Sequence, residues 1–395
     1  MKVLGIETSC DETAVCLIEV EGDFGDAFNF KILGNSLVSQ AALHAKFGGV
    51  FPNLAKREHA KNLVPMLEEA LREAGALHQT TEPISGTMLL PLKNILSREP
   101  ELFSLLLPFL LKHRKPDVDI IAVTHGPGLE PALWVGINFA KALSTVWNIP
   151  IVAVNHMEGH IFLSMMEIVS PSSGGLGEFE YPILALLISG GHTELVLSKS
   201  FGEYEIIGQT RDDAAGEAFD KVARLLDLGY PGGPEISRLA AEARRDEMTS
   251  HRKLPRPMIH EDNFDFSFSG LKTAVRNVVG TYQGPALSMD IKKEIAREFE
   301  DAVADVLVAK TIRAIEAYGV HTLVVGGGVS ANTHIRDRLA TTLRESGDAI
   351  ALLVPQPELA TDNAIMIALA GYFHALKKEF ADLATLDAKG NLELT

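Results

Sequence analysis

The stretch Val3-Leu-Gly-Ile-Glu-Thr-Ser-Cys-Asp-Glu-Thr13, with the apolar run 14–20 directly after it, decides the fold. It predicts a strand, a short polar turn and a second strand, which together make a hairpin. The same pattern returns 180 residues later in Leu184-Ala-Leu-Leu-Ile-Ser-Gly-Gly-His-Thr193, so that Ser9 aligns with Ser189. We therefore expect the chain to contain two copies of one ancestral unit.

The two halves also match further along the chain. A third strand follows each hairpin, and each half then continues with a strand, a helix and a strand. These segments are residues 32–36, 119–123, 131–147 and 149–154 in the first half, and 206–210, 322–325, 333–346 and 349–354 in the second. Apolar strands that alternate with helices indicate an α/β architecture with sheets covered on both faces. The duplicated pattern resembles the actin, sugar-kinase and Hsp70 superfamily of ribonuclease H-like domains, which implies a ligand cleft between the halves.

Length and composition agree with two domains. The chain has 395 residues, of which 46% are hydrophobic, and this is more than one core normally contains. Pro, Ser and Gly dominate residues 170–177, which predicts a linker. We expect a first α/β domain at residues 1–168, a linker at 169–180, a second α/β domain at 181–378 and a tail at 379–395.

Residues 79–115 interrupt the first copy. We expect a helical insertion there, with Ser97 as the N-cap of a leucine-rich helix that contains Pro108. One interpretation is a lid that packs on its own domain. The other is a contact with a partner protein or a membrane surface.

Charge and cysteine content restrict the class of protein. A formal net charge of −16 favours a soluble cytoplasmic protein and argues against a surface that attracts nucleic acid everywhere. Any RNA contact must then come from local basic segments, such as residues 251–256 and 272–276, or from a partner. Two cysteines make no disulfide framework, the acidic start is unlike a signal peptide, and no apolar run is long enough to span a membrane.

A histidine pair follows the last strand of the first half. His156 and His160 are four residues apart, so on a helix both imidazoles lie on one face and can reach one metal ion. By the internal symmetry, Asp362 opens a helix at 363–373 after the last strand of the second half and becomes a candidate third ligand. The alternative is that Asp362 only caps that helix.

The position of Glu158 tests whether this is a protease. A zinc protease needs a glutamate directly beside a ligand histidine, whereas Glu158 lies in the middle of the pair. This argues against peptidase chemistry. Two imidazoles and one carboxylate leave coordination positions open for a substrate and suit one divalent ion, Fe(II) first and Zn(II) second.

Three glycine-rich turns indicate a nucleotide. They are Ser189-Gly-Gly-His192, Gly326-Gly-Gly328 and Tyr230-Pro-Gly-Gly-Pro234, and turns of this kind expose backbone N–H groups to an anion. Asp220 could accept hydrogen bonds from ribose hydroxyls, or it could be a solvated helix carboxylate. The first hairpin lacks the Asp-x-Gly-x-Thr signature of sugar kinases, which disfavours phosphate transfer.

These motifs together resemble the universal tRNA threonylcarbamoyladenosine synthase family of the TsaD or Gcp type. The resemblance rests on the stretches at 5–13, 44–49, 126–129, 156–160, 187–193, 212–221, 230–234, 265–273, 326–332 and 361–363. It implies transfer of a threonylcarbamoyl group from threonylcarbamoyl-AMP to N6 of adenosine 37, in tRNAs that read codons starting with A.

The resemblance also assigns roles to residues. It places the metal on His156, His160 and Asp362. It places the adenylate on Leu187, Ile188, Ser189, Gly190, Gly191, Asp220, Gly233 and Asn332. Asp11 and Glu12, in the first hairpin turn, could accept a proton from the attacking amine.

Two departures and two alternatives stand beside the resemblance. Pro131 and Ala364 replace glycines of the family pattern, so the geometry near the metal could differ slightly. The resemblance implies work with partners, either a bacterial-type paralogue and an ATPase or an archaeal-type kinase-containing complex. The alternatives are a non-catalytic scaffold of the same fold and an ATP-dependent small-molecule kinase.

Overall fold

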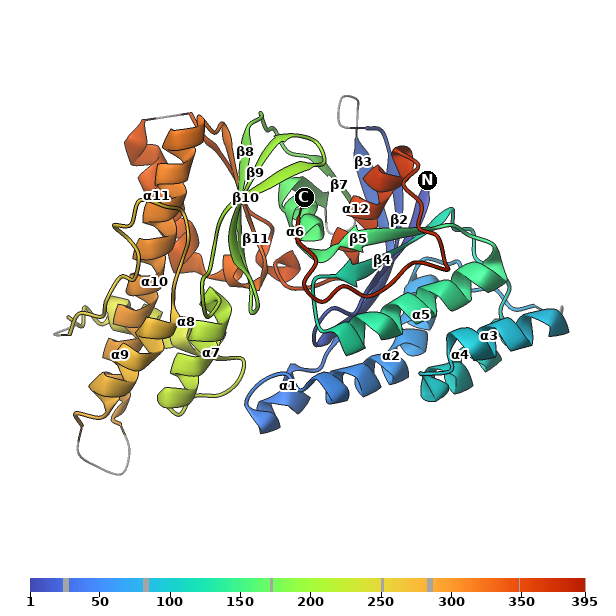
Figure 1. Ribbon diagram of the computed structural model, residues 1–395, viewed down its shortest axis with the longest axis horizontal. Helices are drawn as coiled ribbons and strands as arrows, with labels where there is room; N and C mark the ends of the chain where they lie inside the picture. The colour runs from blue at the N-terminus through green and yellow to red at the C-terminus, as the bar shows by residue number, and fades with distance from the viewer. Residues whose placement is uncertain are drawn as a thin grey trace. The chain divides into compact units, whose positions relative to one another are not determined.

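The computed structural model describes residues 1–23, 28–80, 85–170, 173–249, 252–282, 287–347 and 349–394 (Figure 1). Residue contacts divide it into two compact units, each with its own hydrophobic core. The first unit contains residues 1–43, 50–177 and 362–394, and the second contains residues 44–49 and 178–361.

The first unit is built on a seven-stranded sheet with the order β5-β4-β1-β2-β3-β7-β6. β1 pairs with β2 in antiparallel fashion and with β4 in parallel, β2 pairs antiparallel with β3, and β4 pairs parallel with β5. The strands are β1 (Lys2–Glu7), β2 (Glu12–Glu21), β3 (Asn29–Ser39), β4 (Ile120–Gly126), β5 (Ile151–Asn155), β6 (Met166–Ser170) and β7 (Ser173–Leu176).

The second unit has a five-stranded sheet with the order β10-β9-β8-β11-β12. Its strands are β8 (Ile183–Ile188), β9 (Thr193–Ser200), β10 (Glu203–Gln209), β11 (Thr322–Gly326) and β12 (Ala351–Leu353). If the strands are numbered along their own half of the chain, five strands in each sheet have the same order, 3-2-1-4-5, and β7 and β6 extend the first sheet beyond its third strand. In both sheets the first three strands pair with one another in antiparallel fashion, and the fourth and fifth are parallel to the first. The predicted duplicated α/β fold is therefore confirmed.

Alternation along β1 explains how the first sheet is covered on both faces. Leu4 and Ile6 belong to the core formed with α2 (Pro52–Glu73) and α5 (Glu130–Trp147). Gly5 faces the other way, because a Cβ there would meet the Ala364 carbonyl oxygen at 2.4 Å. That second face carries α12 (Ala364–Leu376) and α6 (His156–Met165), the two helices that form the candidate site.

The helix α12 differs from the expected domain division. We expected residues 181–378 to form the second domain, but residue contacts place 362–394 with the first unit. Nearly every residue of α12 is buried, and the helix packs on β1, β2, β4 and α6. A helix that is apolar on all sides reveals that it is buried, but not against which sheet.

Other expected boundaries shift for local reasons. The helix expected to carry the two histidines is α6, which begins at His156 itself and ends at Met165, where β6 begins. The expected linker contributes β6 and β7 to the first sheet, although residues 171–172 lie outside the described residues.

The insertion at 79–115 is helical, as expected, apart from residues 81–84, which lie outside the described residues. It contains a 3-10 turn (Gly86–Met88), α3 (Leu89–Ile95) and α4 (Pro100–Lys112). The predicted cap was wrong, because Glu99, not Ser97, precedes α4, and no side chain caps it. Among the described helices, none combines the length and the apolar character that crossing a bilayer requires.

The helices of the second unit pack around one aromatic and aliphatic core. Phe219 of α7 and Phe299 of α10 meet edge to face, with ring centroids 5.0 Å apart. The helices are α7 (Ala215–Leu225), α8 (Gly232–Arg245), α9 (Ser269–Val279), α10 (Met289–Tyr318), the 3-10 turn η3 (Gly328–Ala331) and α11 (Thr333–Ser346).

Candidate metal centre

The strand β5 turns directly into α6, and this junction presents the two histidines. Asn155 caps the helix: its side-chain oxygen accepts hydrogen bonds from the backbone N–H groups of Met157 at 2.9 Å and Glu158 at 3.4 Å. His156 and His160 therefore lie one turn apart in a regular helix, 6% and 1% exposed. Each buried imidazole needs a polar partner, and at this spacing one group can serve both.

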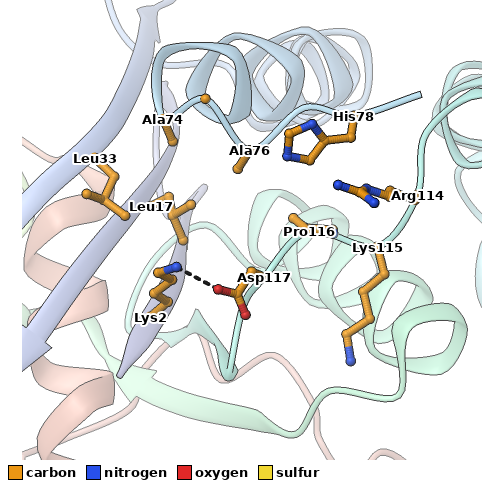
Figure 2. Close-up of a pocket in the computed structure, with 11 residues that line it drawn as sticks. Lys2, Leu17, Leu33, Ala74, Ala76, His78, Arg114, Lys115, Pro116 and Asp117 are labelled. Carbon is orange, nitrogen blue, oxygen red and sulfur yellow. Dashed lines mark hydrogen bonds and ion pairs between the residues drawn. The ribbon is translucent and has the colours of Figure 1, made fainter. Parts of the chain in front are cut away.

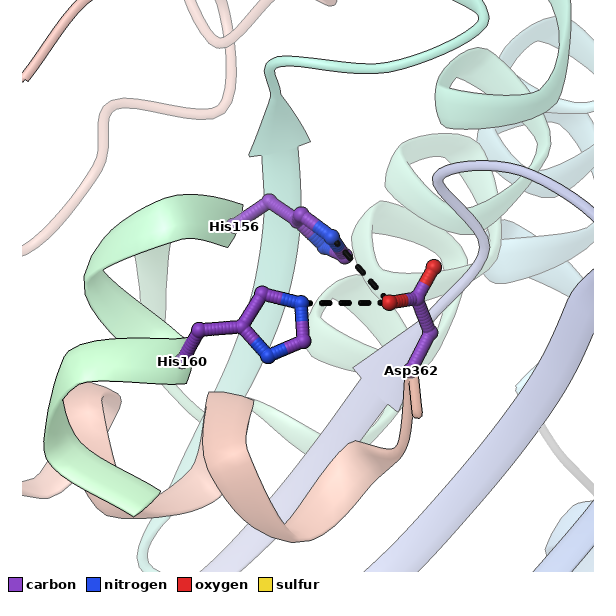
Figure 3. Close-up of side chains that lie close together, drawn as sticks. All are labelled: His156, His160 and Asp362. Atoms are coloured by element: carbon purple, nitrogen blue, oxygen red, sulfur yellow. Dashed lines mark hydrogen bonds and ion pairs between the residues drawn. The ribbon is translucent and has the colours of Figure 1, made fainter. Parts of the chain in front are cut away.

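That partner is Asp362 (Figure 3). Its Oδ1 lies 3.4 Å from Nε2 of His156 and 3.2 Å from Nε2 of His160. The cap of α12 is the next residue, Asn363, whose side chain accepts the Met366 N–H at 3.1 Å. The alternative that Asp362 caps the helix is therefore wrong, and its carboxylate is turned to the histidines.

The three ligand atoms fit one divalent ion. They all lie within 4.8 Å of one another, and the three residues belong to the first unit. Zinc and similar ions bind His nitrogen and Asp oxygen at about 2.0–2.2 Å, which places neighbouring ligand atoms a little over 3 Å apart. Two imidazole nitrogens aim at one carboxylate oxygen, so a proton or a cation has to bridge them. The group can therefore hold a metal ion.

Charge in the group favours a cation. Burial alone would lower the pKa of His156, but the carboxylates of Asp362 and Glu7 outweigh it and raise that pKa well above 6.5. Burial alone would raise the pKa of Asp362, but His156 and His160 hold it far below its usual range. The site thus pairs an ionised carboxylate with a protonated imidazole, and a metal ion would replace that proton.

The predicted acids of the first hairpin behave differently from Asp362. Burial, followed by the charges of Asp362 and Asp11, raises the pKa of Glu12 to about 9. Its Oε1 accepts a hydrogen bond from the Ser39 hydroxyl at 3.0 Å. Glu12 is therefore within electrostatic reach of Asp362, and it carries a proton at neutral pH when no cation balances Asp362.

The sequence analysis missed Glu7 and did not find the partner of Glu158. Glu7 contacts His156 Nδ1 at 3.1 Å, and Glu158 contacts His374 Nε2 of α12 at 2.7 Å. A charged residue at the end of the buried strand β1 was the available signal for Glu7. No signal indicated His374, because it lies more than 200 residues from Glu158.

The structure also connects the residues predicted to bind adenylate, all in the second unit. Leu187 and Ile188 are fully buried in β8, so only their backbone groups could reach a ligand. Gly190 and Gly191 are exposed, and nothing lies within 4 Å of a Cβ at either position. Ser189 accepts the Gly216 N–H through its backbone oxygen at 3.1 Å, which holds this turn against the start of α7.

Asp220 of α7 contacts the start of α8 at Gly232, the residue before Gly233. Oδ1 of Asp220 accepts the N–H of Gly232 at 2.7 Å, and no atom lies within 4 Å of a Cβ at Gly233. The amide of Asn332 donates to Ser237 at 2.8 Å and to Glu300 at 2.7 Å, so both of its N–H groups already have partners. These hydrogen bonds link the turn at residues 189–191, the starts of α7 and α8, and Asn332 near the ends of β8 and β11.

A separate cavity lies away from the histidines (Figure 2). It measures about 440 Å³ and is lined by Leu17, Arg114 and neighbouring residues, with Lys2 paired to Asp117 at 2.6 Å. Lys2 begins β1 and Glu7 ends it, which separates this cavity from the metal ligands by roughly 16 Å of strand. The cavity is therefore not part of the candidate metal centre.

Known proteins provide an independent comparison. A family model described as TsaD, tRNA N6-adenosine threonylcarbamoyltransferase, matches residues 31–85 and 110–369, and the gap falls on α3 and most of α4. A protein of that name from Enterococcus faecalis is 42% identical over 381 residues, covering 96% of this chain and 92% of its own. One from Bacillus cereus is 41% identical over 392 residues, covering 99% and 96%.

Two solved structures show a more distant similarity. Component A of the (R)-2-hydroxyglutaryl-CoA dehydratase of Acidaminococcus fermentans is 14% identical, with a TM-score of 0.46, covering 96% of this chain and 99% of its own. Full-length HypF is 13% identical, with a TM-score of 0.49, covering 95% of this chain and 46% of its own. The family model and the nearly full-length relatives decide the matter: the chain belongs to the tRNA N6-adenosine threonylcarbamoyltransferase family.

Proposed function

We propose that this enzyme transfers the threonylcarbamoyl group of threonylcarbamoyl-AMP to N6 of adenosine 37, in tRNAs that read codons starting with A. Family membership supports the transfer to a tRNA adenosine. The observation that carries the mechanism is the buried convergence of His156, His160 and Asp362 on one point.

The three ligands would hold Fe(II), or Zn(II) as the alternative, and keep it rigid because α6 and α12 are both buried. When bound, such an ion would act as a Lewis acid that polarises the carbamoyl carbonyl and orients the threonyl part. The adenosine amine forms the new C–N bond, and the bond from the carbamoyl carbon to the phosphate oxygen breaks, so AMP leaves. Asp11 or Glu12 accepts the proton that the amine loses.

The adenylate is proposed to bind in the second unit. The exposed turn at residues 189–191, which follows Leu187 and Ile188 of β8, and the N-terminus of α8 beside Gly233 favour a phosphate. Asp220 is the acceptor for ribose, and its bond to Gly232 fixes its orientation. Because both N–H groups of Asn332 have partners, we assign it to holding α8 and α10 in place beside the nucleotide.

Partners are proposed from charge and relationship. A net charge of −16 leaves little attraction for tRNA by itself, so partner proteins contribute to binding it. The relatives compared above are bacterial proteins, which favours the bacterial-type paralogue and ATPase over the archaeal-type kinase-containing complex.

The test is reconstitution. Purified protein is incubated with threonylcarbamoyl-AMP, the bacterial-type partners and unmodified tRNA, and the modified nucleoside is measured by mass spectrometry. We expect product with wild type and with His321→Ala, an exposed histidine that serves as the matched control. Product should fall at least about 100-fold in His156→Ala and Asp362→Ala, which remove a ligand of the polarising ion.

The opposite results are equally specific. Undiminished product in folded His156→Ala or Asp362→Ala protein would refute the metal mechanism. A complete partner system that yields no product with wild type would refute the transfer and favour the non-catalytic scaffold.

A further inference from the structure

Glu7 is a buried acid that the proposed mechanism does not use. It is the last residue of β1 and is 0% exposed. Its Oε2 accepts hydrogen bonds from the Thr124 hydroxyl at 2.5 Å and from Nδ1 of His156 at 3.1 Å. Its Oε1 accepts the backbone N–H of Ser9. Both oxygens are therefore oriented by groups at or near the ends of the three strands β1, β4 and β5.

In the part of the chain that the structure describes, the ion pairs of Glu7 include His156 but neither lysine nor arginine. A fully buried carboxylate is costly, so its presence needs a compensating positive charge nearby. The imidazole of His156, together with a cation bound on the other side of that ring, meets this need.

The geometry also selects the form of the imidazole. With Glu7 accepting from Nδ1, the proton of neutral His156 stays on Nδ1 and the lone pair stays on Nε2. Nε2 is the atom that lies 3.4 Å from Oδ1 of Asp362. A carboxylate on the far nitrogen of a ligand histidine fixes the ring and strengthens it as a donor.

We propose that Glu7 is a positioning residue of the metal centre, which orients His156 and makes its Nε2 a stronger ligand. Glu158, the acid between the two histidines, does not have this role, because its carboxylate faces His374 at 2.7 Å. Glu7 and Thr124 lie at the ends of the parallel strands β1 and β4, whose pairing makes the support rigid.

The proposal rests on the proposed metal centre and is tested by metal affinity without turnover. Co(II) is titrated into metal-free protein and followed by its visible absorption in wild type, Glu7→Gln, Glu7→Ala and Thr124→Val. The matched control is Glu99→Gln, since Glu99 is another buried acid of the first unit and accepts the Asn138 amide at 2.9 Å.

Glu7→Ala should weaken Co(II) binding by about 10- to 100-fold. Glu7→Gln should lie between Glu7→Ala and wild type, with altered absorption bands, and Glu99→Gln should match wild type. A Co(II) affinity within about 2-fold of wild type in folded Glu7→Ala overturns the proposal. If Glu7→Ala does not fold, the same result in Glu7→Gln overturns it. Wild type that binds no Co(II), Zn(II) or Fe(II) would instead overturn the metal centre itself.

Discussion

Burial and two neighbouring carboxylates raise the pKa of Glu12 to about 9, and this value decides what Glu12 can do. At neutral pH it carries its proton and cannot act as a base. A cation held by Asp362 opposes the largest charge acting on Glu12 and lowers its pKa toward the usual range. In the proposed mechanism, binding of the ion would therefore also turn Glu12 from a protonated acid into a base.

The Glu12→Gln variant tests this role. We expect a fall of about 10²- to 10⁴-fold in kcat, the usual contribution of a general base, with little change in KM. Metal content should stay unchanged, because Glu12 is not a ligand. The control is Ser39→Ala, which removes the hydrogen bond to Oε1 but keeps the carboxylate. A Glu12→Gln enzyme with near wild-type kcat would assign the proton transfer elsewhere.

Gly5 shows how closely strand and helix approach at the site. A Cβ at this position would meet the Ala364 carbonyl at 2.4 Å and the Ala368 Cβ at 2.9 Å. Gly5→Ala should therefore cost about 1–3 kcal/mol in the free energy of unfolding and displace the start of α12, which follows Asp362.

Urea unfolding and Co(II) titration measure both effects of Gly5→Ala. Gly229→Ala is the control, since nothing lies within 4 Å of a Cβ there. A Gly5→Ala protein as stable as wild type would contradict this packing.

The sequence predicts the members of the His156, His160 and Asp362 group better than their surroundings. The spacing of His156 and His160 is local, and the internal repeat led to Asp362. Glu7 was missed because its role depends on the spatial neighbourhood of β1, β4 and α6, which residue types alone do not specify.

At the scale of elements, an ion pair joins the two helices that carry the ligands. Nε2 of His374 on α12 lies 2.7 Å from Oε2 of Glu158 on α6. Burial alone would lower the pKa of His374, but Glu158, with Glu379 behind it, raises it to about 9. The folded pKa exceeds the ordinary value, so the pair stabilises fully below about pH 6.5 and is lost as the pH rises through about 9.

The pH dependence of unfolding measures this ion pair. At pH 6, His374→Ala should lower the free energy of unfolding by up to about 3 kcal/mol, and at pH 10 the difference from wild type should largely vanish. His321→Ala is the control. An equal loss at both pH values would mean that His374 contributes packing and not charge.

Element type was predictable, whereas element partners were not. The repeated order of strand, helix and strand placed α5 and α11 to within one residue. The assignment of α12 failed because the repeat suggested the second half, while packing on β1 and α6 placed it in the first unit. The ligands therefore lie within one unit and not across two copies.

At the scale of the whole molecule, the chain returns at its end to the first unit. The tail donates the Ala381 N–H to Ile151 of the edge strand β5 at 2.8 Å and the Lys389 N–H to His125 at 2.8 Å. Gly126 makes room for it, because a Cβ there would meet the Lys389 carbonyl at 2.0 Å. The predicted tail is thus an ordered part of the fold along the described residues 379–394.

Removal of residues 381–395 should lower the stability of the first unit. The truncation exposes the apolar contact of Leu386 and frees several hydrogen bonds, a loss on the order of 3 kcal/mol. Leu386→Ala, at a side chain 7% exposed, should reproduce about 2 kcal/mol of it. Leu383→Ala, at a side chain 37% exposed, should be nearly neutral. A truncated protein with the same melting temperature as wild type would contradict the structural role of the tail.

The central claim is that His156, His160 and Asp362 hold one ion, and anomalous diffraction tests it most directly. Crystals of protein purified without oxygen and without chelators are measured at the iron and zinc absorption edges. The account predicts one anomalous peak per chain, at about 2.0–2.2 Å from an imidazole nitrogen of each histidine and from an oxygen of Asp362. An ion located elsewhere, or an ion bound by the histidines while the carboxylate of Asp362 is turned away, would contradict it.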